Sequence, residues 1–143
     1  MRLPTPLAVP LLASTLLLGA CRDEPLAALE QAADRLQENL DAKAAGSALE
    51  QLHAQFRARS DLDLDWAGRT MALLFLRHRQ VKVLTLGRTC ELDATYSDRG
   101  HCRAQVALAG AESLVPDSAR LYSVRSEWWR EGGDWQLARL DWE

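Results

Sequence analysis

Between residues 25 and 56, apolar residues recur at intervals of three and four, a spacing that predicts helices. From Pro25 onward this spacing forms one apolar face of a long amphipathic helix. The residues of that face are Leu26, Leu29, Ala33, Leu36, Leu40 and Ala44. Gly46 is expected to end the helix, and Ser47 to cap a second one. The apolar stripe of the second helix comprises Leu49, Leu52 and Phe56.

A dense apolar block from Met71 to Leu76 predicts a third helix, for which Asp65 is a suitable N-cap. Because this helix is apolar on nearly every side, we expect it to be the most buried of the three. The basic segment Arg77-His78-Arg79 follows it, and positive charge is favourable at the C-terminal end of a helix.

From Val81 onward the period changes to two, and residues that favour β-structure dominate. The pattern predicts four strands, Val81–Asp93, Arg99–Ala109, Ser118–Arg130 and Asp134–Trp142. Gly132-Gly133 is a strong signal for a two-residue hairpin turn. The predicted fold class is therefore α+β, with three N-terminal helices packed on one face of a curved antiparallel sheet of about four strands.

The chain begins with the pattern of a secretory signal peptide. Arg2 precedes an apolar run from Leu7 to Leu18, and the small residues Gly19 and Ala20 follow. The run is too short to span a bilayer, which takes about 20 apolar residues. We therefore expect residues 1–20 to be removed and residues 25–143 to form one domain. The alternatives are an uncleaved signal anchor and a coincidental cysteine at position 21.

The stretch Leu18-Gly19-Ala20-Cys21 resembles the lipobox of bacterial lipoproteins. This resemblance implies that Cys21 becomes the N-terminal residue and carries acyl chains such as palmitate, which hold the protein on a membrane. In enteric bacteria an Asp after the lipidated cysteine keeps a lipoprotein in the inner membrane. Position 22 is Arg, so the resemblance implies sorting to the outer membrane, facing the periplasm, with the inner membrane as the alternative. Residues 21–24 form a tether that reaches only roughly 10 Å. We expect any partner to be a membrane-proximal envelope protein.

Two further cysteines meet if the first hairpin has a five-residue loop, Ala94 to Asp98. In that register Glu91 faces His101 and Cys90 faces Cys102, so opposite charges pair across the strands. The periplasm is oxidising, and we therefore predict a disulfide between Cys90 and Cys102. A redox-active pair or a metal site is the less favoured alternative.

Composition and charge exclude several classes of function. The hydrophobic fraction of 48% and the charged fraction of 26% are typical of a globular protein. The formal net charge is −3, and −4 without Arg2, and no basic cluster is interleaved with aromatic residues, so we expect no nucleic-acid partner. The sequence has no phosphate-binding loop, nucleophile elbow or dinucleotide glycine pattern, and we expect no cofactor and assign no catalytic residue.

Isolated titratable residues are interpreted as structural. His53 and His78 fall on different predicted helices, and a lone histidine needs a partner in space to act as a base. Asp61, Asp63 and Asp65 lack the glycine and the distal glutamate of a calcium-binding loop, so a solvated acidic turn is expected and no metal site.

Four of the five tryptophans lie in the last predicted hairpin. They are Trp128, Trp129, Trp135 and Trp142, and we expect two or three of them in the core. Trp128 and Trp129 are adjacent in a strand, so without a bulge one of them points to the open face of the sheet. That residue is a candidate for a dimer interface, a partner surface or a sugar-stacking platform. Tyr122, in the third strand, is a further candidate interface or ligand residue.

Residues 25 to 143 resemble the nuclear transport factor 2-like superfamily, which includes ketosteroid isomerases and SnoaL-like proteins. The resemblance rests on the opening helix, on residues 48–52 and 75–83, and on the ending Trp128-Trp129-Arg130-Glu131-Gly132-Gly133-Asp134-Trp135-Gln136-Leu137. It implies a cone-shaped, cystatin-like roll whose helices wrap the concave face of the sheet. Isomerase members place a carboxylate base and a tyrosine–acid pair in the cone, but Tyr96 and Tyr122 lie in no matching motif. We expect a closed apolar core or a small apolar pocket.

Three functions stay open at this point. The favoured one is a non-catalytic, lipid-anchored envelope protein that binds a protein partner or a small apolar ligand, with a homodimer expected through the open sheet face. The first alternative is an isomerase or hydrolase that acts on a hydrophobic substrate in the cone. The second is cell-wall sugar binding through an exposed tryptophan.

Overall fold

The computed structural model describes residues 24–110 and 121–143, together with Met1. The predicted signal peptide, Cys21 and the first residues of the predicted strand at 118 lie outside this part of the chain. The three helices are α1 Glu24–Asp41, α2 Ala45–Glu50 and α3 Leu64–Arg77. The strands are β1 Leu52–Ala58, β2 Val81–Leu92, β3 Arg99–Gly110, β4 Leu121–Glu131 and β5 Asp134–Trp142. None of the described helices is long and apolar enough to cross a membrane.

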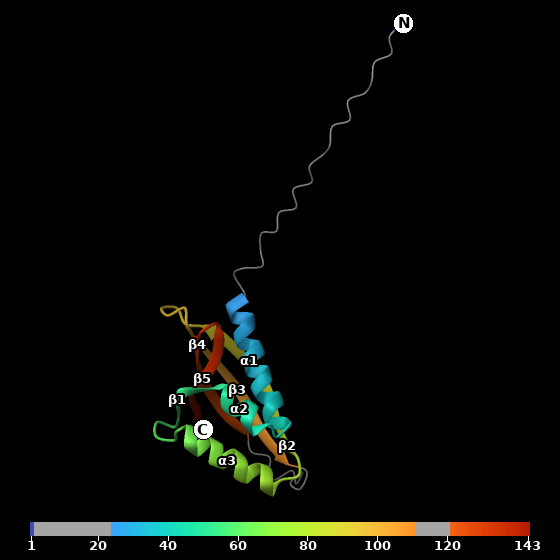
Figure 1. Ribbon diagram of the computed structural model, residues 1–143, viewed down its shortest axis with the longest axis vertical. Helices are drawn as coiled ribbons and strands as arrows, with labels where there is room; N and C mark the ends of the chain where they lie inside the picture. Colours follow the sequence, from blue (N-terminus) through green and yellow to red (C-terminus); the bar gives the residue numbers. More distant parts are fainter. Residues whose placement is uncertain (2–23, 111–120) are drawn as a thin grey trace.

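The five strands form one sheet in the order β1-β5-β4-β3-β2. Strands β2 to β5 pair as an antiparallel meander, and β1 lies parallel to β5 at one edge. Helix α1 runs along one face of the curved sheet, and α3 crosses the far end of the molecule (Figure 1). The predicted α+β class is confirmed, although the sheet has five strands and is mixed.

Strand β1 corrects the prediction of a long second helix. Helix α2 ends at Glu50, and both Leu52 and Phe56 belong to β1. The register of β1 on β5 shifts between Leu52 and Arg57, so the buried positions do not alternate with a period of two. The bulge spaces the apolar residues as a helix would, and the sequence pattern therefore pointed to the wrong element.

The helix ends also differ from the predictions. Helix α1 stops at Asp41, before Gly46, and Lys43 takes the left-handed conformation with φ 55°. The Lys43 ammonium donates to the carbonyls of Phe75 and His78 at the end of α3, which holds this residue in place. Helix α2 has Ala44, not Ser47, at its N-cap.

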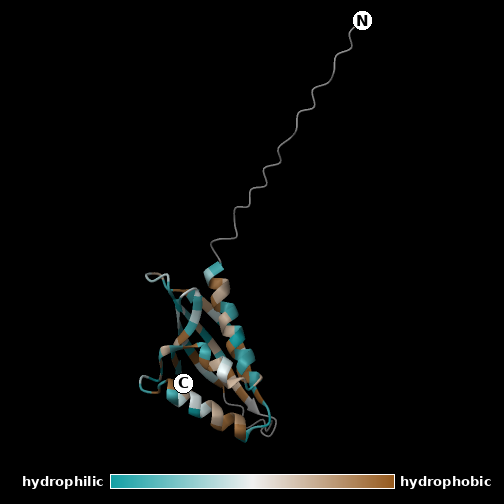
Figure 2. Cartoon of the chain, viewed as in Figure 1, coloured by the Kyte–Doolittle hydropathy of each residue, from teal (hydrophilic) through white to brown (hydrophobic). Residues whose placement is uncertain are grey.

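The third helix is not the most buried one, contrary to the prediction. Its N-cap is Asp63 instead of Asp65, with the Trp66 N–H donating to Asp63 Oδ1 at 3.0 Å. Ala67 is its one buried residue. The leucines near its end, Leu73, Leu74 and Leu76, are exposed, Leu76 to 86%. Figure 2 shows this apolar end at the edge of the molecule, where the described part of the sheet does not cover it.

The core lies between α1 and the inner face of the sheet. Its largest members are Leu29, Phe56, Trp128, Trp135 and Leu137, each less than 4% exposed. The indole Nε1 of Trp135 donates to the carbonyl of Pro25 at 3.1 Å and so fixes the start of α1 against β5.

Polar side chains of α1 cover the outer edge of β2. Gln37 donates to the Val83 carbonyl at 3.0 Å, and Asp41 accepts from the Val83 N–H at 2.7 Å. An edge strand whose backbone groups are occupied in this way cannot add another strand at that point.

The first hairpin has the predicted register and contains the predicted disulfide. Glu91 pairs with His101 and Cys90 with Cys102, and the two sulfur atoms are bonded. Cys102 is 4% exposed and belongs to the core. The second hairpin turns at Gly132-Gly133, both with positive φ, as a two-residue turn of this type requires.

Gly100 allows α1 to approach the sheet, and its replacement is expected to destabilise the fold. A Cβ atom there would lie 2.5 Å from Leu29 Cδ2, in a fully buried part of the core. We expect Gly100→Ala to lower the free energy of unfolding by about 1–3 kcal/mol, as overpacking of cores does. Gly46→Ala, at an open helical position, should instead raise it by about 0.5–1 kcal/mol. Urea unfolding followed by circular dichroism measures both, and equal stability of the two variants would contradict the close approach.

Candidate functional site

Helix α1 covers the inner face of the sheet, and the opposite face, here called the open face, carries charged residues in rows. Directly opposed residues on neighbouring strands point to the same side. One row takes a residue from each of the five strands, in the order β2, β3, β4, β5 and β1. It consists of Glu91, His101, Glu127, Arg139 and Arg57. A second row consists of Arg103, Arg125 and Asp141.

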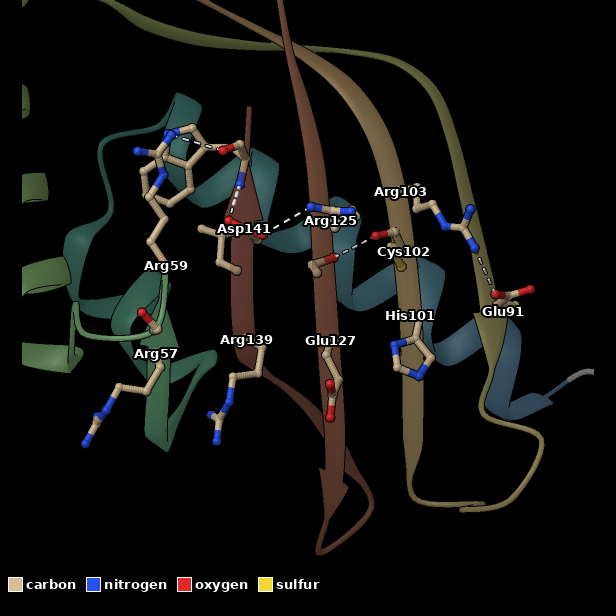
Figure 3. Close-up of a pocket in the computed structure, with 14 residues that line it drawn as sticks. Arg57, Arg59, Glu91, His101, Cys102, Arg103, Arg125, Glu127, Arg139 and Asp141 are labelled. Carbon is tan, nitrogen blue, oxygen red and sulfur yellow. Dashed lines mark hydrogen bonds and ion pairs between the residues drawn. The ribbon is translucent and has the colours of Figure 1, made fainter.

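These rows line an open trough of about 860 Å³. Figure 3 shows its charged side chains projecting from neighbouring strands. The lining contains five arginines and three carboxylates, which are Arg57, Arg59, Arg103, Arg125, Arg139, Glu91, Glu127 and Asp141. The chain as a whole has a net charge of −3, so positive charge is concentrated on this face.

Ion pairs connect most of the carboxylates of the trough. Arg103 lies 3.6 Å from Glu91, and Arg125 lies 3.2 Å from Asp141. Exposed pairs of this kind contribute about 0–1 kcal/mol each, so they order the side chains more than they stabilise the fold.

Trp128 and Trp129 divide between the two faces, as the sequence predicts. Trp128 is 2% exposed and lies in the core, whereas Trp129 is half-buried and lies on the open face, opposite Arg99. The guanidinium carbons of Arg99 and Arg139 lie 4.6 and 4.8 Å from its ring centroid, and they reach it from the strands on either side of β4. Its Nε1 donates to Glu127 at 2.6 Å, and the ring of His53 meets it edge-on. Trp129 is thus part of a packed cluster.

The other aromatic candidates lie apart from Trp129. Trp142 is half-buried at one end of the trough, stacked on Trp66 with centroids 6.3 Å apart, and Arg59 lies 4.3 Å from its ring. Tyr122 pairs with Val106 and therefore faces the inner side of the sheet. Tyr96 is exposed in the loop between β2 and β3. Tyr122 therefore shares the inner side of the sheet with the buried Trp128, and it lies on the opposite face from Trp129.

A second, smaller cavity of about 120 Å³ lies between α1 and the inner face of the sheet. Apolar side chains dominate its lining, among them Leu36, Leu40, Val83, Val106 and Trp128. Its polar members are Gln37, Thr85, Arg88 and Ser126, together with Arg103, whose side chain points to the open face. No His, Asp, Glu or Tyr is among the described residues that line it. Substrate pockets commonly measure about 300–1,000 Å³, so this cavity suits at most a very small apolar ligand.

The polar side chains of the inner cavity are largely occupied with one another. Gln37 accepts from the Thr85 hydroxyl at 2.9 Å, and Arg88 pairs with Asp34 on α1. The Ser126 oxygen accepts from the Trp128 indole at 3.0 Å.

The isolated histidines have structural surroundings. His53 is 5% exposed and lies in β1, whereas the sequence pattern predicted a helix there. Its Nε2 lies 2.9 Å from Glu131, and its Nδ1 accepts from the Gln55 N–H at 3.0 Å. His78 forms the C-cap of α3. Within residues 24–110 and 121–143, no three His, Cys, Asp or Glu side chains lie close enough together to hold a metal ion.

Asp93 organises the loop between β2 and β3. Its carboxylate accepts from the backbone N–H groups of Thr95 and Tyr96, at 2.8 and 2.9 Å, and from His101 at 3.1 Å. The Tyr96 bond first, and then the His101 and Thr95 bonds, lower the pKa of Asp93 to about 2.

This lowered pKa predicts an acid-sensitive hairpin. The ionised Asp93 stabilises the folded state above the ordinary carboxyl pKa of 3.8, and this contribution is lost as the pH falls through about 2. We expect Asp93→Asn to flatten the decline of unfolding free energy between pH 4 and 2. Asp98→Asn, in the same loop, is the control. Urea titrations at several pH values measure both, and parallel curves for Asp93→Asn and the wild type would contradict the assignment.

Comparisons with known proteins show what the fold resembles. No protein-family model matches the sequence, and no curated protein does. Among solved structures, an NTF2-like protein of unknown function from Pseudomonas putida matches with a TM-score of 0.67 at 9% identity, over 80% of this chain and 82% of that one. The described part of the chain has the NTF2-like fold.

Two other solved structures have the same fold. A hexachlorocyclohexane dehydrochlorinase, LinA-type3 from Novosphingobium barchaimii, matches with a TM-score of 0.67 at 14% identity, over 85% of this chain and 87% of that one. Bd1075 of Bdellovibrio bacteriovorus matches with a TM-score of 0.68 at 9% identity over 80% of this chain, which spans only 38% of Bd1075. The NTF2-like fold hosts enzymes as well as proteins of unknown function, so activity has to be argued from the site.

Proposed function

We propose that this protein is a non-catalytic, lipid-anchored envelope protein that binds a protein partner on the open face of its sheet. The observation that carries this proposal is the two charged rows on the face opposite α1, one across all five strands and one across β3, β4 and β5. The surroundings of the trough favour a protein as the binding partner, because exposed leucines lie on the same face of the sheet. They are Leu84 and Leu86 on β2 and Leu121 on β4, exposed by 43–56%. Apolar patches bordered by charges are typical of protein interfaces.

The inner cavity supports the non-catalytic part of the proposal. General acid–base chemistry needs a titratable group within hydrogen-bond reach of the reacting atom. The described lining offers the Arg88 side chain but no carboxylate, histidine or tyrosine, and the side chain of Arg103 lies on the open face. The hexachlorocyclohexane dehydrochlorinase has the same fold but is only 14% identical to this chain, and a shared fold alone does not imply a shared reaction.

The anchor rests on the sequence. Cys21 lies outside the described residues, and α1 begins at Glu24, three positions after it. In Figure 1 the start of α1 lies at the same end of the molecule as the β2–β3 and β4–β5 turns. An acyl group on Cys21 would therefore hold these turns close to the membrane, with the outer membrane as the proposed location.

Sugar stacking receives less support than a protein partner. A sugar ring needs an open aromatic face, and guanidinium groups from both neighbouring strands lie over the ring of Trp129.

Native electrophoresis of membranes in mild detergent tests the proposal. We expect the wild-type protein to migrate in a complex larger than its own 15.9 kDa chain. Leu86→Glu should abolish that complex, because it places a charge in the apolar part of the open face. Leu76→Glu is the matched control, since Leu76 is an exposed leucine on α3. A complex that survives Leu86→Glu would contradict the proposal. If two differently tagged copies of the protein co-purify, the complex is a homodimer and the partner is a second copy of this chain.

A further inference from the structure

Two arginines at the β1 end of the five-strand row make no ion pair with a described carboxylate. Arg139 donates through Nη1 to the carbonyls of Gln55 and Ala138, both at 2.7 Å. Arg57 donates through Nη1 to the carbonyl of Phe56 at 2.8 Å. Backbone carbonyls orient a guanidinium but do not neutralise its charge.

The nearby carboxylates are already occupied. Glu127 lies opposite Arg139, but its Oε1 accepts from Arg99 at 3.1 Å and from the Trp129 indole. Asp63 is the N-cap of α3. Its pKa is lowered first by the Trp66 N–H bond and then by the charge of Arg57, yet no ion pair joins Asp63 to Arg57 within the described chain.

The two guanidinium groups are placed to act together. Arg57 and Arg139 are register partners on the parallel strands β1 and β5, and Figure 3 shows both side chains extending in the same direction. Arg139 is also held against the Trp129 ring at 4.8 Å. In both arginines the hydrogen bonds to backbone carbonyls use Nη1, which leaves Nη2 and Nε donors for a ligand. Groups ordered before binding lose less conformational entropy when a ligand arrives.

We propose that Arg57 and Arg139 form a carboxylate-binding site for an acidic segment of the partner protein. This inference rests on the proposed function and specifies the chemistry of its partner. The planar fork of arginine matches a carboxylate with two parallel hydrogen bonds. Glu127 and Asp141 stand in the same trough, and their negative charge disfavours a dianionic phosphate more than a single carboxylate. The leucines on the same face favour a polypeptide over a free small anion.

Fluorescence anisotropy with a dye-labelled hexaglutamate peptide tests the site on the full-length protein in detergent. We expect binding that weakens with salt, and no binding of hexaglutamine. Arg57→Gln and Arg139→Gln should each weaken hexaglutamate binding about tenfold, as expected for lost charge-assisted hydrogen bonds. Arg103→Gln is the matched control, because Arg103 lies in the same trough and is paired with Glu91; it should change the affinity less than about threefold.

Arg57 carries the decisive variant, because its side chain is exposed and its loss leaves the core intact. Arg57→Lys keeps the charge but loses the fork, and an intermediate affinity is expected. Equal affinities for Arg57→Gln and Arg103→Gln, or no binding to the wild type, would overturn the carboxylate site. Displacement of the peptide by inorganic phosphate at a lower concentration than acetate would overturn the preference for carboxylate.

The two proposals fail in different ways. If Leu86→Glu dissociates the native complex but Arg57→Gln leaves hexaglutamate binding unchanged, the open face binds a partner of different chemistry. If neither experiment gives the expected result, the open face is not the binding surface.

Discussion

Replacing Phe56 with alanine is expected to lower the free energy of unfolding by about 3–5 kcal/mol, the cost typical of a phenylalanine removed from a core. Phe56 is 1% exposed and belongs to the cluster that joins β1 to α1 and the rest of the sheet. Because small domains are stable by only about 5–15 kcal/mol, this loss should lower the melting temperature strongly. Thermal unfolding followed by circular dichroism measures the effect.

Gln55→Ala is the matched control for Phe56→Ala. Gln55 is the preceding residue of β1, and its side chain is exposed. A surface substitution of this kind should stay within about 0.5 kcal/mol of the wild type. If both variants melted together with the wild type, β1 would not hold its observed place in the core.

Removing the disulfide is expected to lower the free energy of unfolding by about 3 kcal/mol, the chain-entropy value for a loop of this size. Cys90 and Cys102 are separated by 12 residues, and Cys102 lies among core side chains. The double variant Cys90→Ala with Cys102→Ala avoids burying a hydroxyl group in place of each sulfur. Urea unfolding of the variant and the wild type, without reductant, measures the difference.

Thiol labelling provides the chemical control for the disulfide. The denatured protein should show no free thiol at Cys90 or Cys102 until a reductant is added. Full labelling of both cysteines without reductant would contradict the bond.

The meander could be predicted because its determinants are local. The strands from residue 81 alternate with a period of two, Gly132-Gly133 fixes one turn, and the facing charges of Glu91 and His101 fix one register. The disulfide follows directly from that register.

Strand β1 could not be predicted because its pairing is long-range and irregular. Leu52 pairs with Leu137, far along the chain, and the shift before Arg57 removes the alternation that would mark a strand. The exposure of the leucines near the end of α3 was not predicted either, because an apolar block alone does not show whether anything packs against it.

The candidate site was predicted only in part. The sequence register already placed Glu91 beside His101, and strand alternation predicted that Trp128 and Trp129 divide between the two faces, without saying which one is exposed. The pairing of Arg57 with Arg139 was missed because Arg57 belongs to β1, which was predicted as part of a helix. Arg57 and Arg139 become neighbours only when β1 is recognised as a strand beside β5.

The location of binding on the open face is tested most directly by site-specific photo-crosslinking in cells. A photoreactive residue at Gln105, an exposed position of β3 on the open face, is compared with one at Glu30, an exposed position of α1. We predict that Gln105 gives a defined adduct with a second protein and that Glu30 gives none. An adduct at Glu30 alone, or equal yields at both positions, would contradict binding on the open face.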